Sequence, residues 1–460
     1  MNAHDSDRMA EVLEAHGWTT AASVDEADLV VLNTCSVREK AEQKLRSEVG
    51  KLARYKEAKR GGMVLAVAGC VAQQEGEKLL ARVKHLDLVV GPDNLAELPR
   101  LVADQIAGAP PRAHTVFDVD TPRFLAAAPA PGAAPVSAFI TTMKGCDERC
   151  SFCIVPYTRG PERYRPAGEI LAEAERWVAA GAREITLLGQ TVDSYRDASL
   201  PPPASDDPDE SQFPSLLRLL ARVPGLRRVR YTSPHPRHLT PALVDAHREL
   251  DVLARHVHMP VQSGSDRMLK RMIRRYTRAE YTERVRRLQG ARPDLTVSTD
   301  VIVGFPGETE ADFRQTLELV EEIGFTGLFG FKYSPRPFTP ALKLTDDVTE
   351  EEKSERLARL FELSEALGKA HLARLVGTTA SVLVEGRGKT GAWEGRTDRN
   401  EIVHVDAGDE RDLSGEVVAV TITDAFKHSL AGEPTAEALR ALPAPGPHVI
   451  RPLRRRLPLV

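Results

Sequence analysis

Residues 143–160 read MKGCDERCSFCIVPYTRG, and this stretch decides how the rest of the 460-residue chain is interpreted. Its cysteines, Cys146, Cys150 and Cys153, follow the spacing C-x3-C-x2-C, and the chain has no cysteine after Cys153. A four-iron cluster is normally held by four cysteine thiolates. Three thiolates in one short loop therefore predict a [4Fe–4S] cluster in which one iron has no protein ligand. An open metal position is typical of a catalytic site.

Other interpretations of these cysteines fit the sequence less well. A structural zinc site takes four ligands, usually as two C-x2-C pairs. An electron-transfer cluster needs a fourth cysteine. A disulfide framework is disfavoured, because five cysteines is an odd number and the polar first residues do not resemble a secretory signal.

The composition is that of an ordinary globular protein, with 42% apolar and 28% charged residues. The length suggests about three domains. No run of eighteen apolar residues predicts a membrane span, so a cytoplasmic protein is expected. The net charge of −4 does not by itself predict a nucleic-acid partner, so a surface that binds one must be local.

Residues 1–105 alternate between helical and strand-like segments, which predicts an α/β domain with a parallel sheet covered on both faces. Apolar runs end at Cys35, Cys70 and Pro92. In parallel sheets, ligands gather beyond the carboxyl ends of the strands. Either cysteine alone would suit a buried core position, but two at equivalent strand ends predict a second metal centre.

A second α/β domain is predicted over 132–370, after an Ala/Pro-rich linker at 126–136. Its strand-like segments are SAFITTMKG, REITLLGQ, RRVRYTSPHP, HVHMPVQSGS, LTVSTDVIVGFPGE and GLFGFKYSPRP. Six such strands predict a partial TIM-type (β/α)6 barrel, with its active site at the strand ends. One continuous helix is predicted over 266–289. The acidic, Pro/Ser-rich segment 198–212 is predicted to be a flexible surface insertion.

The last part of the chain changes in composition after a charged helix predicted at 349–373. Residues 373–436 contain short strands with Gly-rich turns, which predict a small β-barrel. Residues 437–460 combine arginines with prolines and are predicted to form a disordered basic tail.

With these motifs the chain resembles the methylthiotransferase family of radical-SAM enzymes over nearly its whole length. The stretches that carry the resemblance are NTCSVREKA (33–41), GCVAQQEGE (69–77), CSFCIVPYTRG (150–160), LLGQ (187–190), SPHP (233–236), HMPVQSGSDRMLKRMIRRYTR (258–278) and DVIVGFPGET (300–309). The PYTRG and PVQSGSD segments are similar to those of its tRNA branch. The family's domain order, an N-terminal cysteine-bearing domain, a radical-SAM barrel and a C-terminal TRAM barrel, agrees with the three predicted domains.

The resemblance implies a transferase that methylthiolates carbon 2 of isopentenyl-adenosine at position 37 of tRNA. The cluster on Cys146, Cys150 and Cys153 would bind S-adenosylmethionine at its open iron and generate a 5′-deoxyadenosyl radical. A radical suits this substrate, because acid–base groups cannot open the C–H bond at carbon 2 at neutral pH, and the cofactor carries the difficult step. An auxiliary [4Fe–4S] cluster on Cys35 and Cys70 would supply sulfur. The implied partners are the tRNA anticodon loop and an electron donor such as a flavodoxin or ferredoxin, with a monomer expected.

The sequence also departs from the family's pattern. The family's N-terminal domain normally starts with a strand that ends in a cysteine, whereas this sequence starts at Met1–Asn2. We therefore expect an auxiliary cluster without its third thiolate, and a helix at 5–16 without a preceding strand to pack beside. Phe338 stands where the family usually has Gly, and Thr191 and Asp193 replace Asn residues.

The family binds S-adenosylmethionine at the strand ends of the barrel, which implies a set of contact residues here. They are Gly189, Gln190, Gln262, Ser263, Gly304 and Glu308. Glycine suits close backbone approach to a cofactor, but each of these residues could equally serve a turn.

Two groups of residues are predicted to contact RNA. One is a basic face of the helix expected at 266–289, with Arg267, Lys270, Arg271 and Arg274 at three- and four-residue spacing. The other consists of Arg396 and Lys427 in the TRAM-like segment, with Trp393 as a stacking surface. A solvated charged face is the alternative for the first group.

Two other functions stay open. The chain could be a methylthiotransferase that modifies an aspartate of a small-subunit ribosomal protein. It could also be a non-catalytic, metal-containing RNA-binding module.

Overall fold

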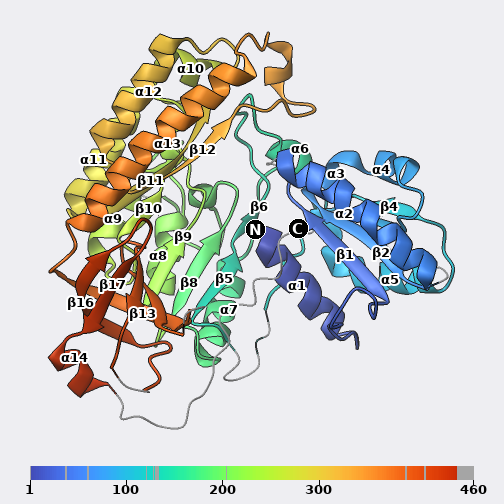
Figure 1. Cartoon of the computed structure of the whole chain (residues 1–460), viewed down its shortest axis with the longest axis horizontal. Helices are drawn as coiled ribbons and strands as arrows, with labels where there is room; N and C mark the ends of the chain where they lie inside the picture. The colour runs from blue at the N-terminus through green and yellow to red at the C-terminus, as the bar shows by residue number, and fades with distance from the viewer. Residues whose placement is uncertain are drawn as a thin grey trace.

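The computed structural model describes residues 2–36, 39–59, 62–120, 122–127, 129, 134–203, 205–388, 391–408 and 411–442. An N-terminal α/β domain lies beside a central open barrel, and a small β-barrel packs against one end of the central barrel (Figure 1). The predicted fold class is confirmed.

The N-terminal domain is a parallel sheet in the order β1-β2-β3-β4. Its strands are β1 (Leu29–Thr34), β2 (Val64–Gly69), β3 (Leu88–Val90) and β4 (Arg112–His114). Helices α1 (Asn2–Glu14) and α5 (Leu98–Ile106) cover one face, and α2 (Glu39–Ala58), α3 (Cys70–Glu75) and α4 (Glu77–Arg82) cover the other. Because both faces are covered, β2 is a continuous apolar run that is buried throughout. The sequence did not predict β4.

Helix α1 has an apolar partner in this fold. Met9 of α1 is buried in the same core cluster as Val64 and Ala66 of β2 and Leu98 of α5. The apolar face of the helix therefore packs on β2, a strand that follows it in the sequence.

The central domain contains six parallel strands in chain order, as predicted. They are β5 (Ser137–Thr141), β8 (Glu184–Leu188), β9 (Arg228–Tyr231), β10 (His256–His258), β11 (Thr296–Val303) and β12 (Gly327–Lys332). The sheets β5-β8-β9 and β10-β11-β12 are joined by a single parallel bridge between Val229 and Leu253. The apolar core lies between these strands and the outer helices α7 (Ala167–Ala179), α8 (Phe213–Leu220), α9 (Pro241–Glu249), α11 (Arg278–Ala291), α12 (Glu310–Ile323) and α13 (Glu350–Ala373).

The prediction of one continuous helix over 266–289 is wrong, because two helices occupy that range. Helix α10 (Asp266–Arg271) ends first, and α11 begins after Thr277. Thr277 and Glu280 form a capping box, in which each side chain accepts a hydrogen bond from the other's backbone amide. The sequence Thr-Arg-Ala-Glu therefore carried the signal for a new helix start.

The segment 198–212 is not wholly a flexible insertion. Glu210, Ser211 and Gln212 are buried. Ser211 donates its hydroxyl to the Asp193 carbonyl at 2.6 Å, and the Gln212 amide donates to the Leu200 carbonyl at 3.0 Å. The end of the segment is thus packed on the barrel.

The C-terminal domain is a closed barrel in the order β13-β14-β15-β17-β16. Its strands are β13 (Thr379–Arg387), β14 (Trp393–Thr397), β15 (Ile402–Val405), β16 (Val417–Ala425) and β17 (Leu430–Pro434). The prediction of a disordered tail from residue 437 is wrong for its first residues, because they form the helix α14 (Ala436–Ala441). Residues 443–460 lie outside the described residues.

Ion pairs join the domains. Arg163 of the central domain pairs with Asp93 of the N-terminal domain, and both are buried. Arg228 of β9 donates to Asp398 of the small barrel at 2.9 Å and to Glu184 of β8 at 3.2 Å. In the described part of the chain, no helix combines the length and apolar character needed to cross a bilayer.

Candidate active site

The cluster loop, residues 145–160, is closed at its base by a short hairpin. β6 (Met143–Lys144) pairs antiparallel with β7 (Arg163–Tyr164). Gly145 has φ +77°, and a Cβ atom there would lie 1.9 Å from the Pro161 carbonyl oxygen. Only glycine fits this close approach, so the base of the loop is fixed by the chain itself.

The surroundings of the three cysteines in this loop favour thiolates bound to iron over free, protonated thiols. Cys146 and Cys150 are each 8% exposed, and Cys153 is partly exposed. Burial raises the pKa of the Cys146 thiol to about 12. Burial, and after it the neighbouring Cys150, raises the pKa of the Cys153 thiol to about 12. Thiols so enclosed lose their protons when a metal ion neutralises them, so the donor set fits an iron–sulfur cluster.

Ligation of a single ion and ligation of a cluster place different demands on the side chains. Among the described residues, no three His, Cys, Asp or Glu side chains converge as ligands of a single metal ion. A cubane does not require such convergence, because each thiolate binds a different iron atom.

Arg274 lies against the cluster loop and not on an RNA-binding face. It is 9% exposed and donates to the Cys150 sulfur at 3.2 Å, to the Tyr276 hydroxyl at 2.8 Å and to the Pro260 carbonyl at 3.0 Å. The prediction that it contacts RNA is therefore wrong. The error follows from the helix prediction, since the chain between α10 and α11 turns this side chain inward.

The end of β8 supports the loop from the barrel side. The Thr191 hydroxyl lies 3.0 Å from the Cys146 sulfur. A Cβ atom on Gly189 would lie 2.7 Å from Cγ of Met143 in the hairpin. Gly189 and Gln190, both predicted to contact the cofactor, are thus placed beside the cluster loop.

The remaining residues implied to contact S-adenosylmethionine are held in turns. Gln262 has φ +74°, and its backbone bonds to Asp300 and Ile302 of β11. Ser263 is fully buried, with its hydroxyl 3.3 Å from that of Thr316.

The turn from Gly304 to Glu308 closes on itself. The Gly304 amide donates to the Glu308 carboxylate at 2.6 Å, and Arg356 of α13 donates to the same carboxylate at 3.0 Å. Burial raises the pKa of Glu308 to about 7. These contacts are turn chemistry, which the sequence left open as the alternative role.

The second cysteine site is assembled by strand register. Thr34 of β1 is the Cα partner of Gly69 of β2, and Cys35 and Cys70 directly follow this pair. Neighbouring strands lie about 5 Å apart, so the register sets the two cysteines side by side. A Cβ atom on Gly69 would lie 2.4 Å from the Asn33 side-chain oxygen, so glycine is required for the two strand ends to meet in this way. The two thiolates could serve as two ligands of an iron–sulfur cluster, and an adjacent cation would balance part of the cluster's negative charge.

That cation is Arg159, which reaches the second site from the cluster loop. Arg159 ends α6 (Val155–Arg159) and is 4% exposed. It donates to the Cys70 sulfur at 3.3 Å and to the Asp5 carboxylate of α1 at 2.6 Å. Burial opposes ionisation of Asp5, but the charge and hydrogen bond of Arg159, together with other nearby positive charges, outweigh it and lower the pKa of that carboxyl. The PYTRG motif contains this arginine, but its role could not be read without the fold.

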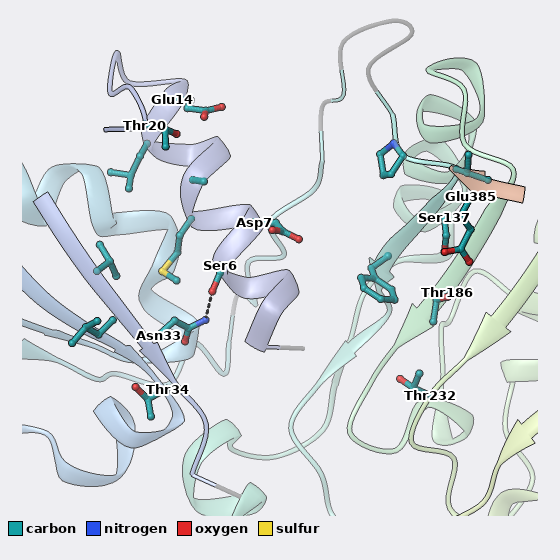
Figure 2. Close-up of a pocket in the computed structure, with 18 of the residues that line it drawn as sticks. Ser6, Asp7, Glu14, Thr20, Asn33, Thr34, Ser137, Thr186, Thr232 and Glu385 are labelled. Atoms are coloured by element: carbon teal, nitrogen blue, oxygen red, sulfur yellow. Dashed lines mark hydrogen bonds between the residues drawn. The ribbon is translucent and has the colours of Figure 1, made fainter. Parts of the chain in front are cut away.

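A cleft of about 2170 Å³ opens between the two α/β domains and extends to the small barrel. Figure 2 shows the side chains of Ser6, Asn33 and Thr34 on the α1 and β1 side, and those of Ser137, Thr186 and Thr232 on the barrel side. Asn33 donates to the Ser6 hydroxyl at 2.9 Å. Aromatic and basic groups also line the cleft, among them Phe139, Phe329, Arg230 and Arg396.

The predicted RNA-contact residues fall in different environments. Arg396 lines the cleft. Lys270 is exposed, Arg271 is half-buried and Arg267 pairs with Asp312. Lys427 pairs with Glu365 at 2.8 Å.

Trp393 does not offer a stacking surface, because it is 5% exposed in the core of the small barrel. The Arg387 guanidinium lies 4.3 Å from its ring centroid.

Comparison with known proteins gives consistent matches. Family models match at residues 1–91 (Uncharacterized protein family UPF0004), 140–320 (Radical SAM superfamily) and 373–435 (TRAM domain). The tRNA-2-methylthio-N(6)-dimethylallyladenosine synthase of Sorangium cellulosum is 65% identical over 484 aligned positions, which cover 100% of this chain and 97% of the relative. The enzyme of the same name from Geobacter metallireducens is 46% identical and covers 94% of this chain and 96% of its own length.

Among solved structures, the radical S-adenosylmethionine methyltransferase TsrM from Kitasatospora setae shares the fold. That structure contains cobalamin and a [4Fe-4S] cluster. The TM-score is 0.50 at 17% identity, covering 74% of this chain and 70% of TsrM.

Proposed function

The chain belongs to the family of tRNA-2-methylthio-N(6)-dimethylallyladenosine synthases, and from this premise we propose that it methylthiolates carbon 2 of N(6)-dimethylallyladenosine at position 37 of tRNA. The alternatives, a ribosomal-protein methylthiotransferase and a non-catalytic RNA-binding module, lack this support. The small C-terminal barrel matches the TRAM domain, which favours an RNA substrate.

Cys146, Cys150 and Cys153 would hold a [4Fe–4S] cluster with one open iron. Bound there with S-adenosylmethionine, such a cluster would supply the radical chemistry that opens the C–H bond at carbon 2. The chain's own residues keep the thiolates in place. Thr191 and Arg274 contact two of the sulfurs, and the hairpin fixes the loop base.

Cys35 and Cys70 would hold the auxiliary cluster that supplies sulfur. The observation that carries this proposal is the position of Arg159. It follows Cys153 by one short helix and donates to the Cys70 sulfur. The two cysteine sites are thereby held next to each other, as a reaction that combines a radical with a sulfur donor requires.

The cleft suits a single nucleoside turned out of an RNA loop. Sequence-specific RNA recognition targets unstacked loop bases that contact aromatic and hydrogen-bonding groups. Phe139 and Phe329 supply aromatic surface, while Arg230 and Arg396 supply charge. Both cysteine sites and the cleft come from one chain, so a monomer suffices.

Nucleoside analysis of tRNA tests the proposal. tRNA from cells that lack this chain should contain N(6)-dimethylallyladenosine without its methylthio group, and the wild-type chain should restore the modification. A C146S/C150S/C153S variant should not restore it. Unchanged tRNA together with loss of methylthio-aspartate from the ribosome would contradict the proposal in favour of the protein substrate.

A further inference from the structure

An exposed apolar patch surrounds the outer side of the cluster loop. Its members are Tyr157 (42% exposed), Ile273 (39%), Phe338 (57%) and Leu342 (48%). The rings of Tyr157 and Phe338 lie with their centroids 5.9 Å apart. We call these four residues the loop patch. Contiguous exposed apolar surface of this kind marks an interaction site.

Ser151, which lies between Cys150 and Cys153, connects the cluster loop to two other chain segments beneath the loop patch. The Ser151 amide donates to the Met272 carbonyl at 2.9 Å, and its hydroxyl donates to the Arg271 carbonyl at 2.8 Å. The Ala341 amide donates to the Ser151 carbonyl at 2.8 Å. Ile273 directly follows Met272, and Leu342 directly follows Ala341, so both are fixed next to the cluster loop.

Two members of the loop patch adopt a costly backbone conformation. Ile273 has φ +57° and Phe338 has φ +69°. Left-handed backbone is a genuine outlier for bulky or β-branched residues, and such strain collects at functional sites. Packing offsets only part of this cost, since Ile273 stays 39% exposed and Phe338 57% exposed.

Basic side chains form the rim of the loop patch. Arg149, Lys270, Arg275 and Lys343 are all exposed. They lie on the same three segments, and none of them forms an ion pair with a described residue. Carboxylates on these segments have other partners: Asp147 accepts the Glu162 amide at 3.2 Å, Asp346 pairs with Lys353 at 2.8 Å, and Asp347 accepts the Gly307 amide at 2.6 Å.

The geometry points to an acidic one-electron carrier protein, such as a flavodoxin, as the partner of the loop patch. This inference rests on the proposed function, because the cluster must be reduced by one electron before it can react. The carrier would lose one electron and the cluster held by Cys146, Cys150 and Cys153 would gain it. No residue of the patch or its rim is among the described residues that line the cleft, so a carrier bound at the patch would leave the cleft open.

The distribution of charge favours a protein over RNA. An RNA surface tracks the phosphate backbone with cations along a groove. Here the cations surround an apolar centre, which is the anatomy of a protein interface with a polar rim. Charge at such a rim mainly steers association.

Binding of oxidised flavodoxin to the holoenzyme tests the inference. We expect R275E/K343E to raise the Kd about tenfold or more at low ionic strength, with a weaker salt dependence. R222E/K84E, which makes the same charge change on exposed residues elsewhere, should bind as wild type does. F338G removes an aromatic group and suits the backbone angle, so it should weaken binding without loss of thermal stability.

Reduction kinetics separate this inference from the proposed function. R275E/K343E should slow cluster reduction by reduced flavodoxin about tenfold or more, but not reduction by dithionite. Dithionite-driven methylthiolation of tRNA should be unchanged in this variant. Equal binding of flavodoxin by all variants would overturn the inference, and so would loss of tRNA binding in R275E/K343E. Failure of wild type to modify tRNA with dithionite would instead overturn the proposed function.

Discussion

The cluster loop and the pair Cys35–Cys70 both bring cysteine side chains together, but the fold does so in different ways. The loop places three cysteines within eight residues and closes its base with a hairpin. The pair joins residues far apart in sequence through the register of β1 and β2. The first site is a property of a local segment, whereas the second depends on the sheet and on its neighbour domain.

At each site, a buried arginine donates to a cysteine sulfur. Arg274 reaches Cys150 from within the central domain, at 3.2 Å. Arg159 reaches Cys70 across the interface between the domains, at 3.3 Å. The second site therefore gains its arginine only when the two domains are docked, and the first is not subject to that condition.

The largest effect is expected from removing the loop thiolates. C146S/C150S/C153S should lose about four iron atoms per chain and all formation of 5′-deoxyadenosine, because the hydroxyls do not replace thiolates as iron ligands. C70S should lose iron only from the second site and still form 5′-deoxyadenosine. Iron analysis and chromatography of the nucleoside check this. If C70S also abolished 5′-deoxyadenosine, the independence of the first site would be refuted.

Breaking the bridge between the sites should have the next largest effect. R159M leaves Asp5 buried without its partner, so the free energy of unfolding should fall by about 3–5 kcal/mol. R159M/D5N removes both charges and should recover most of this loss, while iron at the second site stays depleted because the cation beside Cys70 is gone. Thermal unfolding and iron analysis measure the two effects separately.

The matched control for Arg159 is Arg163. It also pairs across the domain interface, with Asp93, but within the described part of the chain it donates only to oxygen atoms and to no sulfur. R163M should destabilise the protein while iron at the second site is retained. Normal iron at the second site in R159M/D5N would mean that Arg159 acts only by pairing with Asp5.

The difference between the sites also explains what the sequence could predict. The spacing of Cys146, Cys150 and Cys153 predicted a cluster site because the chemistry is local. Apolar runs that end at Cys35 and Cys70 predicted their proximity, since parallel strands share an edge. Arg159 gave no signal of its own, because its partners lie in another domain.

Arg274 illustrates the opposite failure. Its three- and four-residue spacing from Lys270 and Arg271 predicted one exposed helical face, but α10 ends at Arg271. The capping box at Thr277 and Glu280 was visible in the sequence and would have divided the helix. Which way the intervening residues turn depends on the cluster loop that they pack against, and local sequence does not contain that information.

The two regions should respond to pH in opposite directions. Burial raises the pKa of Asp193, near the cluster loop, from 3.8 to about 7. The folded protein then holds one more proton than the unfolded chain between pH 4 and 7, so stability falls as pH rises, by up to about 4 kcal/mol. Burial alone would raise the pKa of Asp5, but the charge and hydrogen bond of Arg159 and other nearby positive charges together lower it. Its stabilising contribution is present above about pH 4 and is lost at lower pH.

D193N tests the first half of this contrast. The Asp193 carboxylate accepts the His235 amide at 2.8 and 3.1 Å, and an asparagine oxygen can accept the same bond. The variant should be more stable than wild type at pH 8 and lose the advantage below pH 4. Denaturant unfolding at both pH values measures this. Parallel stability curves for the two proteins between pH 4 and 8 would show that Asp193 ionises freely in the fold.

The smallest effect is expected from substitution of Arg274. It should change the reduction potential of the cluster and not its assembly. A reduced cluster carries one more negative charge, so a cation that donates to a ligand sulfur stabilises the reduced state. R274M should lower the midpoint potential of the cluster by about 60 mV, a tenfold change in a one-electron equilibrium. R274K should have a midpoint potential close to that of wild type. R275M, which changes an exposed neighbour, should have the wild-type midpoint potential. Electron paramagnetic resonance during a redox titration gives these values with the second site removed by C70S. An unchanged midpoint in R274M would show that the arginine only positions Tyr276 and the Pro260 segment, and the parallel with Arg159 would then fail at the level of charge.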